Sequence, residues 1–325
     1  MNTLTTTFVH AAAVLLCASG FATAALAQNL SNRPVRMIVG SAPGGPSDVQ
    51  IRLLVPKMTE AMGVTIIVDN RASNNGIVGM EIASKSLPDG NTFAVGNSGT
   101  HAVNAYLYKN LPYDPVRDFT PVSQFATTGM VVAANARLPG NSIQELAAHA
   151  KTRNGGLNIA IPGATGELAG DALWSALKIK MTNVQYKGSA PSELAVVSGE
   201  ADISLLTPLA TLKNMQSGRI KVYGITSATR SPVMPDVPTL AEQGVTGYDF
   251  QFWNGLFAPA KTPDAAVRAA YKAIVIALQS PEVAERFRQL GLVPVGNTPE
   301  EFRVIVNRDV EKFRRIIIES GIPRL

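Results

Sequence analysis

The fold of this chain is decided by the stretch Val35-Arg36-Met37-Ile38-Val39-Gly40-Ser41-Ala42-Pro43-Gly44-Gly45-Pro46-Ser47-Asp48. A short apolar run gives way to Pro and Gly, which predicts a strand, a tight loop and the start of a helix. The helix that follows has apolar residues at helical spacing and can pack on the strand; these are Ile51, Leu54, Val55, Met58 and Met62. Its N-terminus would present unpaired amides to an anion such as a carboxylate. An ordinary strand-to-helix turn that binds no ligand is the alternative.

The first 27 residues have the pattern of an export signal. They contain no Asp, Glu, Lys or Arg, are mostly apolar between Phe8 and Phe21, and end in the small-x-small sequence Ala25-Leu26-Ala27. The single cysteine, Cys17, lies inside this segment, so a chain cleaved near Ala27 has no disulfide and no thiol nucleophile. We therefore expect an exported protein that works in the periplasm.

The charge of the chain points to small anions rather than to nucleic acid. Lys and Arg number 29 against 24 Asp and Glu, a net charge of +5, and no cluster of five or more Lys and Arg occurs. A mild positive field of this kind favours the capture of small anions. No spacing of His or carboxylates indicates a metal site, so we expect neither a metal nor a cofactor.

Strands and helices alternate from residue 33 to about 124, and the alternation resumes after an extended segment at 122–135. This pattern predicts an α/β protein with two domains, joined by two extended crossings, the second at 250–259. We assign 28–124 and 254–325 to the first lobe and 125–253 to the second, with a surface loop and short helix at 229–247. The C-terminal helices are expected to return to the first lobe. Ligands of such sheets bind beyond the carboxyl ends of the strands.

Several short motifs occur in an order that resembles one known family. They include Pro43-Gly44-Gly45 with Asp48, and Trp253-Asn254-Gly255-Leu256-Phe257-Ala258-Pro259; the others are at 33–39, 87–90, 100–104, 111–114, 118–122 and 184–188. In these motifs the chain is similar to the extracytoplasmic solute receptors of tripartite tricarboxylate transporters, the Bug or TctC family. The resemblance implies a bilobal type II periplasmic binding protein fold. It also implies a small organic acid or amino-acid-like ligand, integral membrane transporter subunits as partners, and a monomeric receptor that is not an enzyme.

Carried onto this sequence, the resemblance implies a ligand site made of main-chain amides and hydroxyl groups. The first lobe would contribute Ser41, Ala42, Gly44, Gly45, Pro46, Ser47, Asp48, Asn97, Ser98 and Thr100, with the amides of Gly44 and Gly45 as donors. The second lobe would contribute Ala164, Thr165 and Gly166, with Thr207 as an outer candidate. Two departures from the family pattern are the loop at 69–76 and Glu167, which stands where many members have His. We hypothesise that Glu167 tunes the type of ligand; the alternative is that it only stabilises its helix N-terminus.

Two other functions remain open at this point. Gly96-Asn97-Ser98-Gly99 is similar to the turn that carries the nucleophile of a hydrolase, and His101 follows Ser98 by three residues. Thr100 stands where the final Gly of that motif belongs, and a histidine at a helix start more often packs locally. The second alternative is a receptor for a different, ABC-type permease, because a receptor fold alone does not identify its membrane partner.

Overall fold

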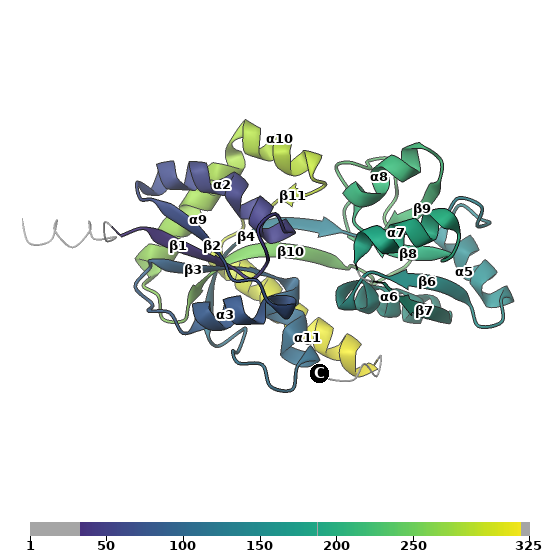
Figure 1. The fold of residues 1–325 in the computed structure, drawn as a ribbon, viewed down its shortest axis with the longest axis horizontal. Coiled ribbons are helices and arrows are strands. Elements are labelled where there is room, and N and C mark those ends of the chain that lie inside the picture. Colours follow the sequence, from purple (N-terminus) through teal and green to yellow (C-terminus); the bar gives the residue numbers. More distant parts are fainter. Residues whose placement is uncertain (1–32, 187, 320–325) are drawn as a thin grey trace, which may run out of the picture.

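The computed structural model describes residues 33–186 and 188–319. The predicted signal segment lies outside these residues. Within them, no helix has the length and apolar character needed to cross a membrane. The chain forms two α/β lobes, each built on its own sheet (Figure 1).

The first lobe is built on a six-stranded sheet with the order β11-β4-β10-β3-β1-β2. Its strands are β1 (Val35–Val39), β2 (Ile66–Asn70), β3 (Thr92–Asn97), β4 (Phe119–Gly129), β10 (Gln251–Pro259) and β11 (Val293–Pro294). β1 pairs in parallel with both β2 and β3, whereas β10 runs antiparallel to β3 and β4. The parallel centre places the carboxyl ends of β1 and β3 at the same edge of the sheet.

Helices cover both faces of this sheet, which explains why the residues of β1 other than Arg36 are apolar and buried. The helices are α2 (Pro46–Met62), α3 (Ile77–Ser84), α4 (Asn104–Leu107), α9 (Asp264–Gln279), α10 (Pro281–Gln289) and α11 (Pro299–Glu319). Met37 packs in one apolar cluster with Ile51 of α2 and Ile274 of α9, while Ile38 packs on the other face with Met80 and Phe302. Ile51, Leu54 and Met58 are fully buried, as predicted from their spacing.

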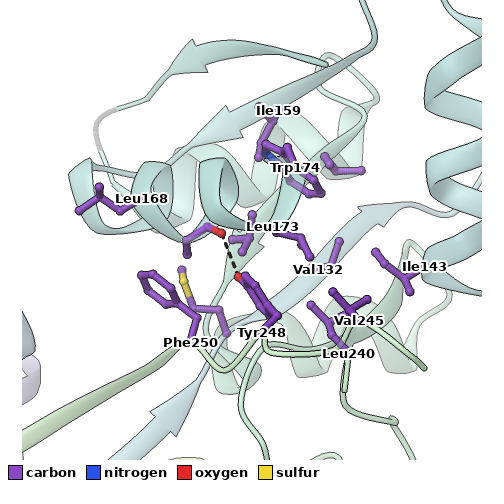
Figure 2. Packing of buried hydrophobic residues seen from close by; sticks show 14 of the residues in the cluster. Val132, Ile143, Ile159, Leu168, Leu173, Trp174, Leu240, Val245, Tyr248 and Phe250 are labelled. Atoms are coloured by element: carbon purple, nitrogen blue, oxygen red, sulfur yellow. Dashed lines mark hydrogen bonds between the residues drawn. The ribbon is translucent and has the colours of Figure 1, made fainter. Parts of the chain in front are cut away.

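The second lobe has a five-stranded sheet with the order β7-β6-β8-β5-β9. Its elements are β5 (Val131–Asn135), α5 (Ile143–Thr152), β6 (Leu157–Ile161), α6 (Ala164–Leu177), β7 (Met181–Gln185), α7 (Ser189–Ser198), β8 (Ile203–Leu206), α8 (Pro208–Gln216) and β9 (Ile220–Ile225). The Ser142 side chain accepts a hydrogen bond from the Glu145 N–H at 3.2 Å, so the expected cap of α5 is present. Figure 2 shows the core of this lobe, where the Tyr248 hydroxyl donates to the carbonyl of Ala169 in α6 at 2.9 Å.

The two sheets are joined by two passages of the chain. β4 ends at Gly129 in the first sheet and β5 begins at Val131 in the second, so Met130 alone separates them. The return passage follows 229–247, where we expected a short helix. The structure instead has turns with isolated bridges between Ile225 and Thr239 and between Ser231 and Met234. The prediction of a helix was wrong because three prolines in seven residues, 232–238, remove the backbone donors that a helix needs.

The last helix, α11, spans both lobes. Its first half packs in the first lobe, where Phe302 and Val306 share a cluster with Trp253. Its second half packs in the second lobe, where Phe313 meets Phe250 with ring centroids 5.4 Å apart. Contacts between α11 and α6 accompany this packing, and Figure 1 shows the yellow helix reaching the edge of the second lobe. The C-terminal helices therefore do not all return to the first lobe alone.

Candidate ligand-binding site

A cavity of about 590 Å³ lies at the carboxyl ends of β1 and β3 and is shared by the two lobes. Its lining residues are Gly40, Ser41, Ala42, Ser47, Ala72, Ser73, Asn75, Gly76, Val95, Asn97, Gly99, Thr100, Val103, Asn104, Leu107 and Thr165. Thr165 belongs to the first turn of α6 in the second lobe, and the others come from the first. The volume is within the range of small-molecule sites.

The structure brings some of the predicted site residues to this cavity and leaves the others outside its lining. Six line it: Ser41, Ala42, Ser47, Asn97, Thr100 and Thr165. Of the other predicted residues whose side chains the structure describes, Gly44, Gly45, Pro46, Asp48, Ser98, Gly166 and Thr207 are not among the lining residues, while the side chain of Ala164 lies outside the description. Thr207, the outer candidate, is an exposed residue at the N-terminus of α8.

The loop that precedes α2 uses its glycine amides internally. The Gly44 N–H donates to the Asp48 carboxylate at 2.8 Å, and the Gly45 N–H donates to the Ala42 carbonyl at 3.0 Å. These two amides were expected to hold the ligand, and the structure corrects that role. Ser47 and Asp48 lie in the first turn of α2, so no carbonyl within the helix accepts from their N–H groups. These two N–H groups are therefore the donors at this end of α2.

Asp48 holds the loop in place. Its carboxylate accepts hydrogen bonds from the amide of Asn70 at 2.9 Å and from Nε of Arg52 at 2.8 Å, besides the one from Gly44. Burial of Asp48 favours the neutral form, but these hydrogen bonds and the Arg52 charge outweigh it and lower the pKa of the carboxyl below its ordinary value of 3.8. Asp48 is therefore an anion that positions the loop.

Ser41 is the cavity residue with the least satisfied side chain. Its hydroxyl oxygen is buried and has no hydrogen-bond partner among the residues that the structure describes. Buried hydroxyl groups are normally hydrogen-bonded, so an orphan in a cavity wall indicates that a partner arrives from the cavity. Ser41 is thus a candidate donor to a ligand.

The segment at 72–76 forms one wall of the cavity. It is part of the loop at 69–76, whose sequence departs from the family pattern. Glycines allow it to approach β1 closely, since a Cβ on Gly79 would lie 2.8 Å from the Cα of Gly40, and one on Gly40 would lie 2.8 Å from the Cα of Gly76. The Asn75 carbonyl accepts a hydrogen bond from Asn104 at 3.0 Å, which fixes the wall from the other side. The Gly76-x-x-Gly79 spacing was the signal in the sequence that could have identified this contact.

A third wall comes from the end of β3. The Asn97 N–H donates to the Thr100 hydroxyl at 2.9 Å, and the Thr100 N–H donates to the Asn97 side-chain oxygen at 3.0 Å. The remaining amide nitrogen of Asn97 lies 3.4 Å from the Ser47 hydroxyl. This network fixes the helical turn Gly99–Val103.

His101 is part of the core and not of the cavity lining. Its ring stacks on Phe257 with centroids 3.8 Å apart, and burial lowers its pKa to about 3. Its Nδ1 lies 2.9 Å from the Thr100 hydroxyl, and Ser98 is itself buried. A buried neutral histidine that pairs with Thr100 does not form the base of a hydrolase at Ser98, so the geometry favours the receptor interpretation.

The second lobe presents the N-terminus of α6 to the cavity. Gly163 precedes the helix with φ of 150°, and its carbonyl accepts the Glu167 N–H at 3.1 Å. The N–H groups of residues 164–166 come before this first bond of the helix, so they have no carbonyl partner within it. Thr165 adds a side chain to the lining. Glu167 is half-buried and does not belong to the lining, so its effect on the ligand type stays a hypothesis.

The family model described as "Tripartite tricarboxylate transporter family receptor", TctC, matches residues 50–322. The chain belongs to this receptor family. TctC receptors are periplasmic solute-binding proteins and not an enzyme family, and the resemblance seen in the sequence is confirmed. A TctC relative from Pseudomonas sp. (strain P51), the "UPF0065 protein in tcbD-tcbE intergenic region", is 32% identical over 291 residues, covering 89% of this chain and 86% of the relative.

Solved structures confirm the bilobal periplasmic binding protein fold of the TctC receptors. An R. palustris protein solved with adipate is 29% identical, with a TM-score of 0.77, and the match covers 91% of this chain and 100% of that one. MatC from Rhodopseudomonas palustris, solved with bound malate, is 29% identical with a TM-score of 0.71, and the match covers 87% of this chain and 99% of that one.

Proposed function

We propose that this receptor captures a small carboxylate-containing metabolite in the cavity between its lobes and delivers it to a tripartite tricarboxylate-type membrane transporter. The observation that carries the proposal is the lining of the cavity. Among the residues that the structure describes, this lining includes no Asp, Glu, Lys or Arg, and the N-terminal turns of α2 and α6 contribute Ser47 and Thr165 to it.

Such a lining suits an anion that is held by dipoles rather than by a counter-ion. A helix N-terminus carries a partial positive charge and unpaired N–H groups, and two of them contribute to one cavity here. The orphan hydroxyl of Ser41 adds a donor from the first lobe, and Thr165 adds a hydroxyl from the second. The proteins solved with adipate and malate have dicarboxylates as ligands, which supports the same class of ligand for this chain.

Capture follows from the division of these donors between the lobes. A ligand that contacts both α2 and α6 interacts more strongly with the form in which the two N-termini are close, so it shifts the population toward that closed form. The transporter then needs to recognise only the closed receptor. Backbone donors recognise a carboxylate without recognising the rest of the molecule, so the site defines a ligand class rather than one compound.

A thermal-unfolding screen tests the proposal. Succinate, malate and adipate are compared with their neutral diamides, and a carboxylate at about 100 times its Kd should raise the free energy of unfolding by about 2.7 kcal/mol. Stabilisation by diamides without stabilisation by any carboxylate would show that the ligand is not an anion.

A pair of threonine variants tests the place of binding. Thr165→Val removes one hydroxyl from the cavity, and Thr207→Val removes one from an exposed helix start outside it. We expect the first to weaken carboxylate binding about tenfold, because a hydrogen bond to a charged group contributes about 1.5–3 kcal/mol, and the second to leave it unchanged. Equal effects of the two variants would contradict the assignment of the cavity.

A further inference from the structure

A second cavity, of about 420 Å³, lies where α11 passes along the second lobe. Its walls come from α11, from α6 and from the segment 246–250, and it shares no lining residue with the first cavity. The segment 246–250 is anchored to α6 by the hydrogen bond from Tyr248 to Ala169 that Figure 2 shows. The cavity is therefore bounded by a helix that begins in the first lobe and by elements of the second.

Basic side chains dominate the charge of this cavity. Arg308, Lys312 and Arg315 line it from α11, and their spacing of four and three residues places them on one face of the helix. One acidic residue, Asp249, also lines it. Its carboxylate already accepts hydrogen bonds from the Ala228 N–H at 3.1 Å and from the side-chain amide of Gln251 at 2.7 Å. We call the cavity lined by these three cations the basic pocket.

Lys312 is the residue that most needs a partner. Its ammonium donates one hydrogen bond, at 2.6 Å, to the carbonyl of Asp249, and it lies 5.1 Å and 5.5 Å from the ring centroids of Phe250 and Phe313. No carboxylate of the described residues lies within ion-pair distance of it. Burial lowers the pKa of Lys312 although Asp309 and Asp249 act to raise it.

An ammonium group has three N–H donors, and the carbonyl of Asp249 uses one of them. A charge that is partly buried beside aromatic rings is more stable with an ion-pair partner or several hydrogen bonds. The neighbouring cations favour an anion over a neutral ligand, because Arg315 and Arg308, the latter also paired with Asp309 at 3.0 Å, extend the positive wall toward solvent. The complement of the basic pocket is an anion with several acceptor oxygens.

We propose that the basic pocket is a second binding site, specific for a phosphate group. A phosphate offers enough acceptor oxygens for the ammonium of Lys312 and two guanidinium groups at once, and guanidinium groups match its geometry. Free inorganic phosphate and the headgroup of an anionic phospholipid share this chemistry. Since α11, α6 and the segment 246–250 all line the pocket, its occupant contacts α11 and the segment 246–250 together.

The full chain, purified without phosphate, is titrated with inorganic phosphate by calorimetry while the first cavity is saturated with a carboxylate that binds there. A parallel sedimentation assay uses vesicles of phosphatidylglycerol, with phosphatidylcholine vesicles as the neutral comparison. Binding in the calorimetric assay alone identifies free phosphate as the ligand. Binding to anionic vesicles identifies a lipid headgroup. Either result supports the site if variants of the basic pocket weaken that binding. Absence of binding in both assays at millimolar phosphate would overturn the proposal.

Three variants decide whether the pocket is responsible. Lys312→Met keeps a long unbranched side chain beside Phe250 and Phe313 while it removes the charge, and we expect it to weaken phosphate binding about tenfold or more. Arg315→Gln changes an exposed side chain, so folding is preserved, and the expected loss is about threefold. Arg314→Gln is the matched control, because it removes the same charge from the next position of α11, where Arg314 pairs with Glu311 at 2.6 Å outside the pocket. If Arg314→Gln weakened binding as much as Arg315→Gln, the effect would be one of net charge and the site would be rejected.

Discussion

The Ser47 hydroxyl donates a hydrogen bond of 2.7 Å to the side-chain oxygen of Asn254, 207 positions later in the chain. It joins the first turn of α2 to β10, the strand that returns from the second lobe. Ser47 lines the cavity and Asn254 does not, so Asn254 positions a cavity residue without belonging to the lining.

Asn254→Ala should therefore weaken carboxylate binding about fivefold and lower the free energy of unfolding by about 1 kcal/mol, because Ser47 loses its fixed acceptor. Calorimetry and urea denaturation measure the two effects. Gln251→Ala is the control on the same strand, since Gln251 bonds to Thr127 and Asp249 away from the cavity. Gln251→Ala should lower the free energy of unfolding without changing the affinity for carboxylate. If the wild type and Asn254→Ala bound carboxylate with equal affinity, the hydrogen bond from Ser47 to Asn254 would not be needed for binding.

Asp48→Asn should lower the free energy of unfolding by about 1–3 kcal/mol at neutral pH, because a buried carboxylate with three donors becomes an amide with mismatched hydrogen bonds. The native pKa of Asp48 lies below its ordinary value of 3.8, so its contribution is complete above that value and disappears as the pH falls through the native pKa. Urea denaturation across this acidic range should show the wild type and the variant converging. Asp264→Asn, with a side chain 87% exposed, should behave like the wild type throughout.

His101 makes the free energy of unfolding depend on pH between about pH 3 and 6.5, above the range in which Asp48 acts. The pKa of His101 falls from 6.5 in the unfolded chain to about 3 in the fold, so below pH 6.5 the unfolded chain binds a proton that the native state does not. This residue alone should lower the free energy of unfolding by up to about 1.4 kcal/mol per pH unit in that interval. His101→Phe keeps a ring against Phe257 and should remove this slope. A slope that is unchanged in the variant would contradict the burial of His101.

Gly79→Ala tests the close approach of the cavity wall at 72–76 to β1. The added Cβ would lie 2.8 Å from the Cα of Gly40 and 3.3 Å from the carbonyl oxygen of Arg71, so backbone must move. We expect a loss of about 1–3 kcal/mol in the free energy of unfolding, with weaker carboxylate binding as the wall shifts. Val78→Ala changes the exposed neighbour on the same helix and should alter stability by less than about 0.5 kcal/mol. Tolerance of Gly79→Ala at wild-type stability would show that this contact is not tight.

The sequence was sufficient for the elements whose signal is local. The apolar run of β1 and the helical spacing of Ile51, Leu54 and Met58 predicted buried elements, and those three side chains are fully buried. In α11 the apolar residues Phe302, Val306 and Phe313 also recur at helical spacing, but this spacing does not indicate which lobe each of them contacts. Phe302 packs in the first lobe and Phe313 in the second because the helix is long enough to span both.

The site was predicted less completely, because much of it depends on contacts between distant residues. The role of Gly44 and Gly45 changed because the Asp48 side chain reaches back to the Gly44 amide, which sequence spacing does not reveal. The wall at 72–76 has no apolar pattern of its own, and its position results from the packing of Gly76 and Gly79 against Gly40. Hydrogen bonds between Asn97 and Thr100 similarly fix the helical turn that follows β3.

The single residue between β4 and β5 limits how the receptor can move. With Gly129 paired in one sheet and Val131 in the other, rotation of the lobes has to be absorbed by a few backbone dihedral angles around Met130. Such a junction resists twisting and stretching far more than a disordered tether of many residues would. The short junction at Met130 therefore restricts the opening angle of the receptor, together with the return passage and α11, and an insertion of glycines there would broaden the distribution of that angle before it altered either lobe.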